Sequence, residues 1–380
     1  MSARPHTSIG SFYGISQIRV KKQVDFWMQR MSGIKPYYAV KCNPEPLLLK
    51  WLSSSGTGFD CASAREIEAV KAVDANADII FANPCKKRED IYYAIDSGVT
   101  TTVVDSSEEI DKLVSCNWTY DSLIRIRVED SGSKMPFGTK FGTSAENVKG
   151  LVDYAKSKGQ NISGISFHVG SGCEDASQYR KAIELAGSLN PSNTIDIGGG
   201  FTNHDFVRAS KEIKMARGYI PSNTRLIAEP GRFFAATSHD LFVKVIGKKA
   251  AINGNGYRYT LDESLYGQFS CIPFDHAQPK WVRIRSENEP KRREVPAILY
   301  GRTCDSVDMI AASPSAEELV EGDWLWFPHM GAYTTVTSTE FNGFPKPPLI
   351  ELDEEPPCPE LFQWPNTIHY VIPVRADLIK

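Results

Sequence analysis

The feature that most constrains the fold is a rhythm of short β-type runs between Tyr37 and Gly231, about twenty to thirty residues apart for the most part. Helix-length amphipathic segments lie between them, the pattern of repeated βα units. We count eight runs, which end in Lys41, Asp60, Asn83, Asp105, Arg125, His168, Gly198–Gly200 and Glu229. Eight such units predict a (β/α)8 TIM-like barrel, in which the C-terminal strand ends form one ligand-facing rim.

Two of the intervening helices have recognisable starts. Ser63 is followed three positions later by Glu66, and Ser106 by Glu109. Each pair matches the Ser-x-x-Glu capping box, in which the serine and glutamate side chains satisfy backbone N–H groups at a helix N-terminus. The strand ends before these helices are thereby fixed in register.

From about Ser238 the rhythm changes to β-rich runs with no helix-length segments between them, which predicts a C-terminal all-β domain. The first strand, residues 12–16, lies outside the eight and is expected to join that sheet. The predicted domains are residues 1–30 (N-terminal strand and helix), 31–236 (barrel) and 237–380 (β domain). We expect the charged run Arg283–Glu294 to be a solvated loop and the Pro-rich segment 346–359 to be an exposed connection.

Charge and composition narrow the class of function. The 380 residues carry a net charge of -3 and are 41% hydrophobic, so neither nucleic acid nor an anionic membrane is the expected partner. No apolar stretch reaches membrane-spanning length and Met1–His6 lacks the core of a signal peptide, which predicts a cytoplasmic protein. The eight cysteines are scattered singly, so neither a zinc site nor a disulfide framework is indicated.

Lys41 is the first candidate catalytic residue, because a buried β-type run rarely ends on an ammonium group that has no partner or role. The alternative is a lysine that simply leaves the core for solvent. Three glycine-bearing stretches follow strands six, seven and eight, where barrels often bind phosphate. They are His168–Gly172, Asp196–Gly200 and Glu229–Arg232.

A phosphate cradle opposite a strand-end lysine indicates pyridoxal 5'-phosphate, whose aldehyde condenses with a lysine amine. The cofactor ring nitrogen needs a carboxylate to keep it protonated, and Glu229 is the candidate. A carboxylate at a helix N-terminus is the alternative for this residue.

Ten short motifs spread along the chain carry a resemblance to a known family across residues 12–344. They are YAVKCN, FDCAS, FANPCK, SFHVGSGC, DIGGGF, AEPGRF, FDHA, YGRTCDSVD, GAYT and FNGF. They are similar to the pyridoxal-phosphate decarboxylases of ornithine, diaminopimelate and arginine, which have an alanine racemase-like fold. The likeness is strongest to the eukaryotic-type and viral ornithine decarboxylases. It implies decarboxylation of L-ornithine to putrescine and carbon dioxide, a step of polyamine biosynthesis.

The resemblance also implies roles for individual residues. Lys41 would hold the cofactor as a Schiff base, Glu229 would pair with the pyridine nitrogen and His168 would stack on the ring. The other cofactor-binding positions that it implies are Asp60, Glu66 and Arg125 around the ring and lysine, and Ser171, Gly198, Gly199, Gly200, Gly231, Arg232 and Tyr333 around the phosphate.

The family builds each active site across a homodimer, so the resemblance implies that Cys304, Asp305, Tyr266 and Phe341 come from the partner chain. Cys304 would protonate the substrate Cα, and Asp275 and Asp305 would bind the distal ammonium. Two carboxylates suit a cationic side chain, whereas a neutral one would leave them unpaired. Without the family context each aspartate reads equally as a turn or cap residue, and Cys304 as a small buried hydrophobe.

Alternatives stay open within this resemblance. The substrate could be L-lysine or L-arginine, or the chain could be an inactive binding protein like the antizyme inhibitors; an antizyme-like regulator is a further implied partner. Three positions depart from the family pattern: Arg302 replaces a proline, Ser306 a glycine and Phe274 a tyrosine. The first two changes fall in the loop that carries Cys304 and Asp305, and Phe274 lacks the hydroxyl that the family has near the substrate.

Overall fold

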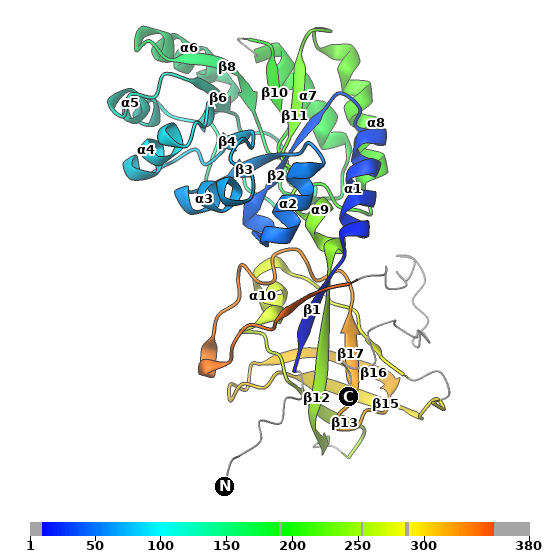
Figure 1. The fold of residues 1–380 in the computed structure, drawn as a ribbon. Helices are drawn as coiled ribbons and strands as arrows, with labels where there is room; N and C mark the ends of the chain where they lie inside the picture. Colours follow the sequence, from blue (N-terminus) through cyan, green and yellow to red (C-terminus); the bar gives the residue numbers. More distant parts are fainter. Residues whose placement is uncertain (1–9, 190–191, 252–253, 286–288, 353–380) are drawn as a thin grey trace. The chain divides into compact units, whose positions relative to one another are not determined.

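The structure is a computed structural model that describes residues 10–189, 192–251, 254–285 and 289–352. The chain divides into two compact units (Figure 1). The barrel unit comprises Lys21–Phe234, and the β-rich unit comprises Met1–Val20 together with Ala235–Lys380. The domain boundaries expected at residues 30 and 236 stay predictions. Each unit is described by itself below.

The barrel unit contains a closed barrel of eight parallel strands in the order β10-β11-β2-β3-β4-β5-β6-β8, which confirms the predicted (β/α)8 architecture. One apolar cluster draws Tyr37, Ile80, Val103, Leu123 and Ile227 from five different strands. The strands are β2 (Lys35–Ala39), β3 (Gly58–Cys61), β4 (Ile79–Phe81), β5 (Thr101–Val104), β6 (Asp121–Arg125), β8 (Asn161–Ser166), β10 (Thr194–Asp196) and β11 (Arg225–Ala228).

Helices alternate with these strands (Figure 1). A two-stranded ribbon of β7 (Ser133–Met135) and β9 (Ser171–Cys173) adds to the loops after β6 and β8. The helices are α1 (Gln17–Arg30), α2 (Pro46–Ser54), α3 (Ala64–Val73), α4 (Arg88–Asp96), α5 (Ser107–Ser115), α6 (Val148–Ser157), α7 (Ser177–Leu189), α8 (Phe206–Ala216) and α9 (Arg232–Ala235). None of the helices in the described ranges is long and apolar enough to cross a membrane.

Both predicted helix starts are observed. Ser63 caps α3 by accepting the Glu66 N–H at 3.3 Å, and the Glu66 carboxylate accepts the Ala62 N–H at 2.6 Å. Ser106 caps α5 in the same way at 3.3 Å. The Glu109 carboxylate instead accepts the backbone N–H of Lys86 at 3.1 Å, so this second glutamate ties its helix to the preceding βα loop rather than to its own cap.

The β-rich unit is an eight-stranded mixed sheet with the main order β14-β17-β12-β13-β15-β16. As predicted, the N-terminal strand joins it: β1 (Phe12–Ile15) pairs antiparallel with β12 (His239–Ala250). The remaining elements are β13 (Tyr257–Leu261), α10 (Cys271–Asp275), β14 (Val282–Arg283), β15 (Glu294–Tyr300), β16 (Met309–Glu317), β17 (Trp324–Phe327) and β18 (Leu349–Glu351).

Part of the Pro-rich segment was predicted wrongly as a plain connection, because Leu349–Glu351 forms β18 and pairs parallel with β1. Strand β1 pairs with β12 along one edge, and this short run, with two apolar residues, pairs along the other. The later β-type run at residues 368–374 lies outside the described residues.

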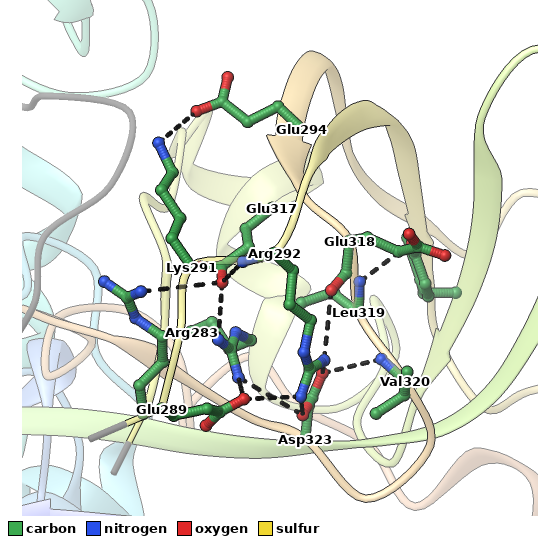
Figure 2. A network of polar contacts seen from close by, with 12 residues as sticks. Arg283, Glu289, Lys291, Arg292, Glu294, Glu317, Glu318, Leu319, Val320 and Asp323 are labelled. Carbon is green, nitrogen blue, oxygen red and sulfur yellow. Dashed lines mark hydrogen bonds and ion pairs between the residues drawn. The ribbon is translucent and has the colours of Figure 1, made fainter. Parts of the chain in front are cut away.

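The expectation of a solvated loop at Arg283–Glu294 is also wrong where the structure describes that run. Arg283 is 6% exposed and Arg285 7%. Figure 2 shows the reason: the Arg283 guanidinium lies 2.6 Å from both the Glu317 and the Glu289 carboxylates. Arg292 pairs with Asp323 at 2.6 Å. The acidic partners Glu317 and Asp323 come from β16 and the turn before β17, so the run alone does not reveal that Arg283 and Arg285 are buried among carboxylates.

Candidate active site

Lys41 lies directly beyond the first barrel strand. Strand β2 ends at Ala39, and a single 3-10 turn, Val40–Cys42, carries the lysine between two buried neighbours. The β2–β3 register places Ala39 opposite Asp60, and the Lys41 Nζ is 2.9 Å from the Asp60 Oδ2. The lysine side chain is 45% exposed while its partner is 1% exposed. Lys41 therefore does not simply leave for solvent, because its ammonium is held on a buried carboxylate.

Glu66 belongs to the same electrostatic group. Its carboxylate is fixed by the Ala62 N–H, one residue beyond β3. Burial raises the pKa of Glu66, the Asp60 charge raises it further, and the Lys41 charge opposes both. The capping box that starts α3 thus places a second carboxyl group near the lysine.

Glu229 follows the last barrel strand, β11, and is buried. Its Oε1 has no hydrogen-bond partner within the described part of the chain. Burial raises the pKa of Glu229 well above the ordinary value, and the negative charges of Asp196 and Asp60 raise it further. A buried carboxyl oxygen without a partner is costly, which marks it as a position that a hydrogen-bonding ligand completes.

Asp196, at the end of β10, is a site residue that the sequence reasoning missed as a side chain. It is fully buried and accepts the Gly198 N–H at 3.0 Å and the Ser166 hydroxyl at 3.1 Å. Burial raises its pKa to about 6. The signal was present in the stretch TIDIGGG, where a carboxylate ends a buried strand, but it was assigned only to a phosphate loop.

His168 follows β8 and is held in one orientation, because its Nδ1 accepts the Gly170 N–H at 2.9 Å. An Nδ1 that accepts cannot also carry the proton, so the ring hydrogen belongs on Nε2. Burial lowers the pKa of His168 well below its usual value, and the positive charges of Arg125 and Lys41 lower it further. The imidazole is therefore neutral. Gly199 lies so close that an added Cβ would meet its Nε2 at 2.9 Å.

Arg125 ends β6 and sits opposite Ser166 of β8 in the barrel register. Its guanidinium lies 5.6 Å from the centroid of the Phe141 ring. The influence of Arg125 on the His168 pKa places this cation within electrostatic range of the site. Its predicted supporting role stays a prediction.

The glycine-bearing loops after β8, β10 and β11 approach one another through their backbones. Gly200 adopts a φ of +95°, and an added Cβ there would lie 2.6 Å from the Gly170 carbonyl oxygen. Gly198 has a φ of +64°. Arg232, which begins α9 directly after Gly231, donates to the Ser171 hydroxyl at 3.3 Å. Ser171, Gly198–Gly200, Gly231 and Arg232 thus lie on three loops of one barrel rim, and their role at a phosphate stays a prediction.

The substrate residues predicted from the partner chain form a second cluster, in the β-rich unit. The Tyr266 hydroxyl donates to the Asp305 carboxylate at 2.5 Å, and the Tyr266 and Phe341 rings stack with centroids 4.3 Å apart. The tyrosine hydrogen bond lowers the pKa of Asp305. Cys304 is exposed, and its N–H and Sγ both bond to the Oδ1 of Asn342, which the sequence reasoning did not single out. We call these five residues the loop cluster.

The segment 301–308 that carries Cys304 and Asp305 is well anchored despite its departures from the family pattern. The buried Asp308 carboxylate accepts the Thr303 N–H at 3.1 Å and the Leu265 N–H at 2.8 Å. Arg302 lies over the Phe344 ring at 4.3 Å and donates to the Pro345 carbonyl at 3.2 Å. An arginine at this position therefore ties the segment to the chain at 344–345.

Two predicted residues of the β-rich unit remain to be placed. Asp275 is the last residue of α10, which ends at a left-handed His276 with a φ of 52°, and the neighbouring Phe274 is 63% exposed. Tyr333 has a φ of 56°, and its carbonyl accepts the Thr337 hydroxyl at 3.0 Å. The roles of Asp275 at a substrate ammonium and of Tyr333 at a phosphate stay predictions.

The barrel-rim residues fit pyridoxal phosphate on their own geometry. The cofactor requires an amine, a carboxylate that keeps its ring nitrogen protonated and a phosphate cradle. The lysine lies in the turn after β2, the buried Oε1 of Glu229 has no hydrogen-bond partner among the described residues, and glycine loops with an arginine lie on the same rim.

Comparison with known proteins agrees with this geometry. Residues 17–236 match the family described as pyridoxal-dependent decarboxylase, pyridoxal binding domain. A chloroplastic ornithine decarboxylase of Nicotiana glauca is 38% identical over 88% of this chain and 81% of its own length. Antizyme inhibitor 2 of Xenopus laevis is 36% identical over 87% of this chain and 78% of its own.

Solved structures are similar over nearly the whole chain. The arginine decarboxylase of Paramecium bursaria Chlorella virus, bound to agmatine, has a TM-score of 0.85 and 35% identity, covering 90% of this chain and 97% of that one. A lysine/ornithine decarboxylase from Vibrio vulnificus, complexed with cadaverine, has a TM-score of 0.82 and 30% identity, covering 90% and 95%.

Proposed function

Because the chain belongs to the pyridoxal-dependent decarboxylases, and is thus a carboxy-lyase that uses pyridoxal 5'-phosphate, we propose that its reaction is the conversion of L-ornithine into putrescine and carbon dioxide. The single observation that carries the chemistry is the buried Oε1 of Glu229, which has no hydrogen-bond partner among the described residues, on a barrel whose first strand leads to Lys41. The choice of ornithine rests on the named relatives and on the proposal that Asp275 and Asp305 both bind the distal ammonium.

When bound, the cofactor supplies a carbonyl for the substrate amine and a protonated ring that accepts the electron pair left by departing carbon dioxide. Lys41 would hold the cofactor through its side-chain amine. Glu229 would accept a hydrogen bond from the ring nitrogen. The negative charges of Asp196 and Asp60 near Glu229 favour a proton in the hydrogen bond between Glu229 and the ring nitrogen.

His168 contributes a neutral, oriented ring. Its Nδ1 is occupied by the Gly170 N–H, so the imidazole presents a flat face and an Nε2–H without adding positive charge. The loops that carry Ser171, Gly200, Gly231 and Arg232 would hold the phosphate, and the phosphate role of Tyr333 is proposed from the family resemblance alone.

The loop cluster binds and protonates the substrate from a second copy of the chain, in a homodimer with shared active sites. Asp305 and Asp275 bind the distal ammonium, and Tyr266 holds the Asp305 carboxylate in its charged form. Cys304 delivers a proton to Cα after carbon dioxide has left. The exposure of Cys304 in a single chain supports a function toward another surface.

Substrate choice is tested by steady-state release of carbon dioxide from L-ornithine, L-lysine and L-arginine by the full chain with pyridoxal phosphate. We expect kcat/KM to be highest for L-ornithine, because two carboxylates at a fixed depth select the length of the cationic chain. A kcat/KM clearly highest for L-arginine or L-lysine would overturn the choice of ornithine and leave the decarboxylase chemistry intact.

A second candidate is a catalytically inactive regulator, favoured by the similarity to an antizyme inhibitor. Such a protein would bind an antizyme-like partner instead of turning over substrate. The presence of Lys41 on Asp60 and of Glu229 at the barrel rim supports the enzyme instead. Release of carbon dioxide from none of the three amino acids, with cofactor present, would favour the regulator.

The shared site is tested by mixing two inactive variants, Lys41→Ala and Cys304→Ala. Random exchange in a dimer leaves half of the molecules mixed, each with one intact site, so activity should return to roughly a quarter of the wild-type level. Recovery of no activity after verified subunit exchange would contradict a site shared between copies.

A further inference from the structure

Asn342 makes the two hydrogen bonds that hold Cys304. Its Oδ1 accepts the Cys304 backbone N–H at 3.2 Å and lies 3.4 Å from the Cys304 Sγ, although the residues are 38 positions apart. The backbone N–H can only donate, so the amide oxygen, not the nitrogen, faces the cysteine. The thiol can then interact with that oxygen only as an S–H donor.

The backbone around Asn342 is built to aim this side chain. Asn342 has a φ of 59°, a left-handed conformation that asparagine tolerates better than most residues. The preceding Phe341 is fixed on the Tyr266 ring, and Thr339 donates its N–H to the Tyr266 carbonyl at 2.7 Å. The Gly343 N–H closes the turn on Glu340 at 2.9 Å. Asn342 is thus held from both sides and has little freedom to turn away.

We propose that Asn342 is a positioning residue that holds and aims the Cys304 thiol for proton transfer. The Asn342 amide oxygen can only accept, so its contact with the thiol orients the S–H group as a donor. The same oxygen fixes the Cys304 backbone, which carries the adjoining Asp305. Asn342 therefore sets both the acid and the neighbouring substrate-binding carboxylate in place.

This inference rests on the proposed role of Cys304 as the Cα acid. A proton delivered elsewhere ends the turnover differently: protonation at the cofactor carbon leaves pyridoxamine phosphate and, after hydrolysis by water, an amino aldehyde in place of the diamine. The fraction of turnovers that leave pyridoxamine phosphate therefore reports whether the acid is correctly placed.

The test compares Asn342→Ala with Asn342→Asp in the full chain loaded with pyridoxal phosphate. The first readout is the rate of iodoacetamide alkylation at Cys304, measured by peptide mass spectrometry, with the exposed Cys85 of the barrel unit as an internal standard. We expect about fivefold faster alkylation in Asn342→Ala, the equivalent of one lost hydrogen bond of about 1 kcal/mol. In Asn342→Asp the retained acceptor and added negative charge should slow alkylation below the wild-type rate.

Opposite effects of the two variants separate positioning from simple loosening of the turn, which would speed alkylation in both. The second readout is pyridoxamine phosphate formed per turnover, expected to rise several-fold in Asn342→Ala. Wild-type alkylation rates and product ratios in both variants, or faster alkylation in both, would overturn the inference. If the wild type releases no carbon dioxide, the proposed function fails while the alkylation comparison still decides whether Asn342 controls the thiol.

Discussion

Both units bury charged side chains, and they do so in different ways. In the β-rich unit, one ion-pair network matches three arginines with three carboxylates (Figure 2): Arg283, Arg285 and Arg292 with Glu289, Glu317 and Asp323. At the barrel rim, by contrast, carboxyl groups gather around one lysine, and an oxygen of Glu229 has no partner among the described residues.

The difference distinguishes a structural charge cluster from a functional one. A buried network in which cations and carboxylates match lowers the cost of its own burial and needs no ligand. The excess of buried carboxyl groups raises the pKa of Glu229, and a positively charged hydrogen-bond donor bound there would offset their negative charge. A protonated pyridine nitrogen is such a donor. Removing a charged group should therefore lower stability in the β-rich unit and lower activity at the barrel rim.

The largest effect is expected at Lys41. Lys41→Ala removes the amine that holds the cofactor, so turnover should fall by at least about a thousandfold and the visible absorption of the bound cofactor should disappear. Spectra and carbon dioxide release measured on the same sample check both. An active, coloured variant would break the assignment of the barrel-rim cluster.

The next effect tests the ion-pair network. Glu317→Gln leaves the Arg283 guanidinium buried with one charge unmatched, and should lower the free energy of unfolding of the β-rich unit by about 3–5 kcal/mol. Glu294→Gln is the matched control, because its pair with Lys291 is largely exposed and should change stability by less than about 1 kcal/mol. Urea unfolding of both variants decides it. Equal, small losses would mean that the buried network is not structurally important.

Glu229→Gln should separate stability from activity. Loss of the carboxylate should lower kcat by about a hundredfold, the scale of one transition-state electrostatic contact. Stability of the cofactor-free protein should not fall, because the variant removes a buried carboxyl group and no ion pair. A loss of stability like that of Glu317→Gln would place Glu229 with the structural charges instead.

The smallest effect is a pH dependence. Because burial and neighbouring charge raise the pKa of Glu229, the folded state keeps its proton at pH values where the unfolded chain has lost it. This contribution to stability is complete below the ordinary pKa of 4.5 and is lost as the pH rises above it. As the pH rises above 4.5, cofactor-free wild type should therefore lose stability more steeply than Glu229→Gln. Parallel profiles would show that Glu229 is not protonated in the empty site.

The sequence predicts the barrel and most of its rim because the relevant signals are local. The residues of each βα unit determine its own strand, and the residues at and just after each strand end lie on the rim by topology alone. Lys41, Asp60 and Glu229 could therefore be found one run at a time. The capping boxes at Ser63 and Ser106 are local in the same sense.

Contacts between distant segments could not be predicted in this way. Arg283 reads as solvated until Glu317, 34 residues later, is placed beside it by the sheet. Asn342 acquires its importance only through Cys304, and Asp196 only through the adjacent strand end that carries Glu229. In each case the role of the residue depends on a neighbour that only the folded structure brings close. Neither the hydrophobic periodicity nor the composition of the sequence predicts that contact.

The most direct measurement of the central claim is chemical trapping of the cofactor. Purified protein is loaded with pyridoxal phosphate, reduced with borohydride and digested, and the labelled peptide is identified by mass spectrometry. The account predicts one stoichiometric label, on Lys41. A label on another lysine, or none, would contradict the assignment of the barrel-rim carboxyl cluster as the cofactor site.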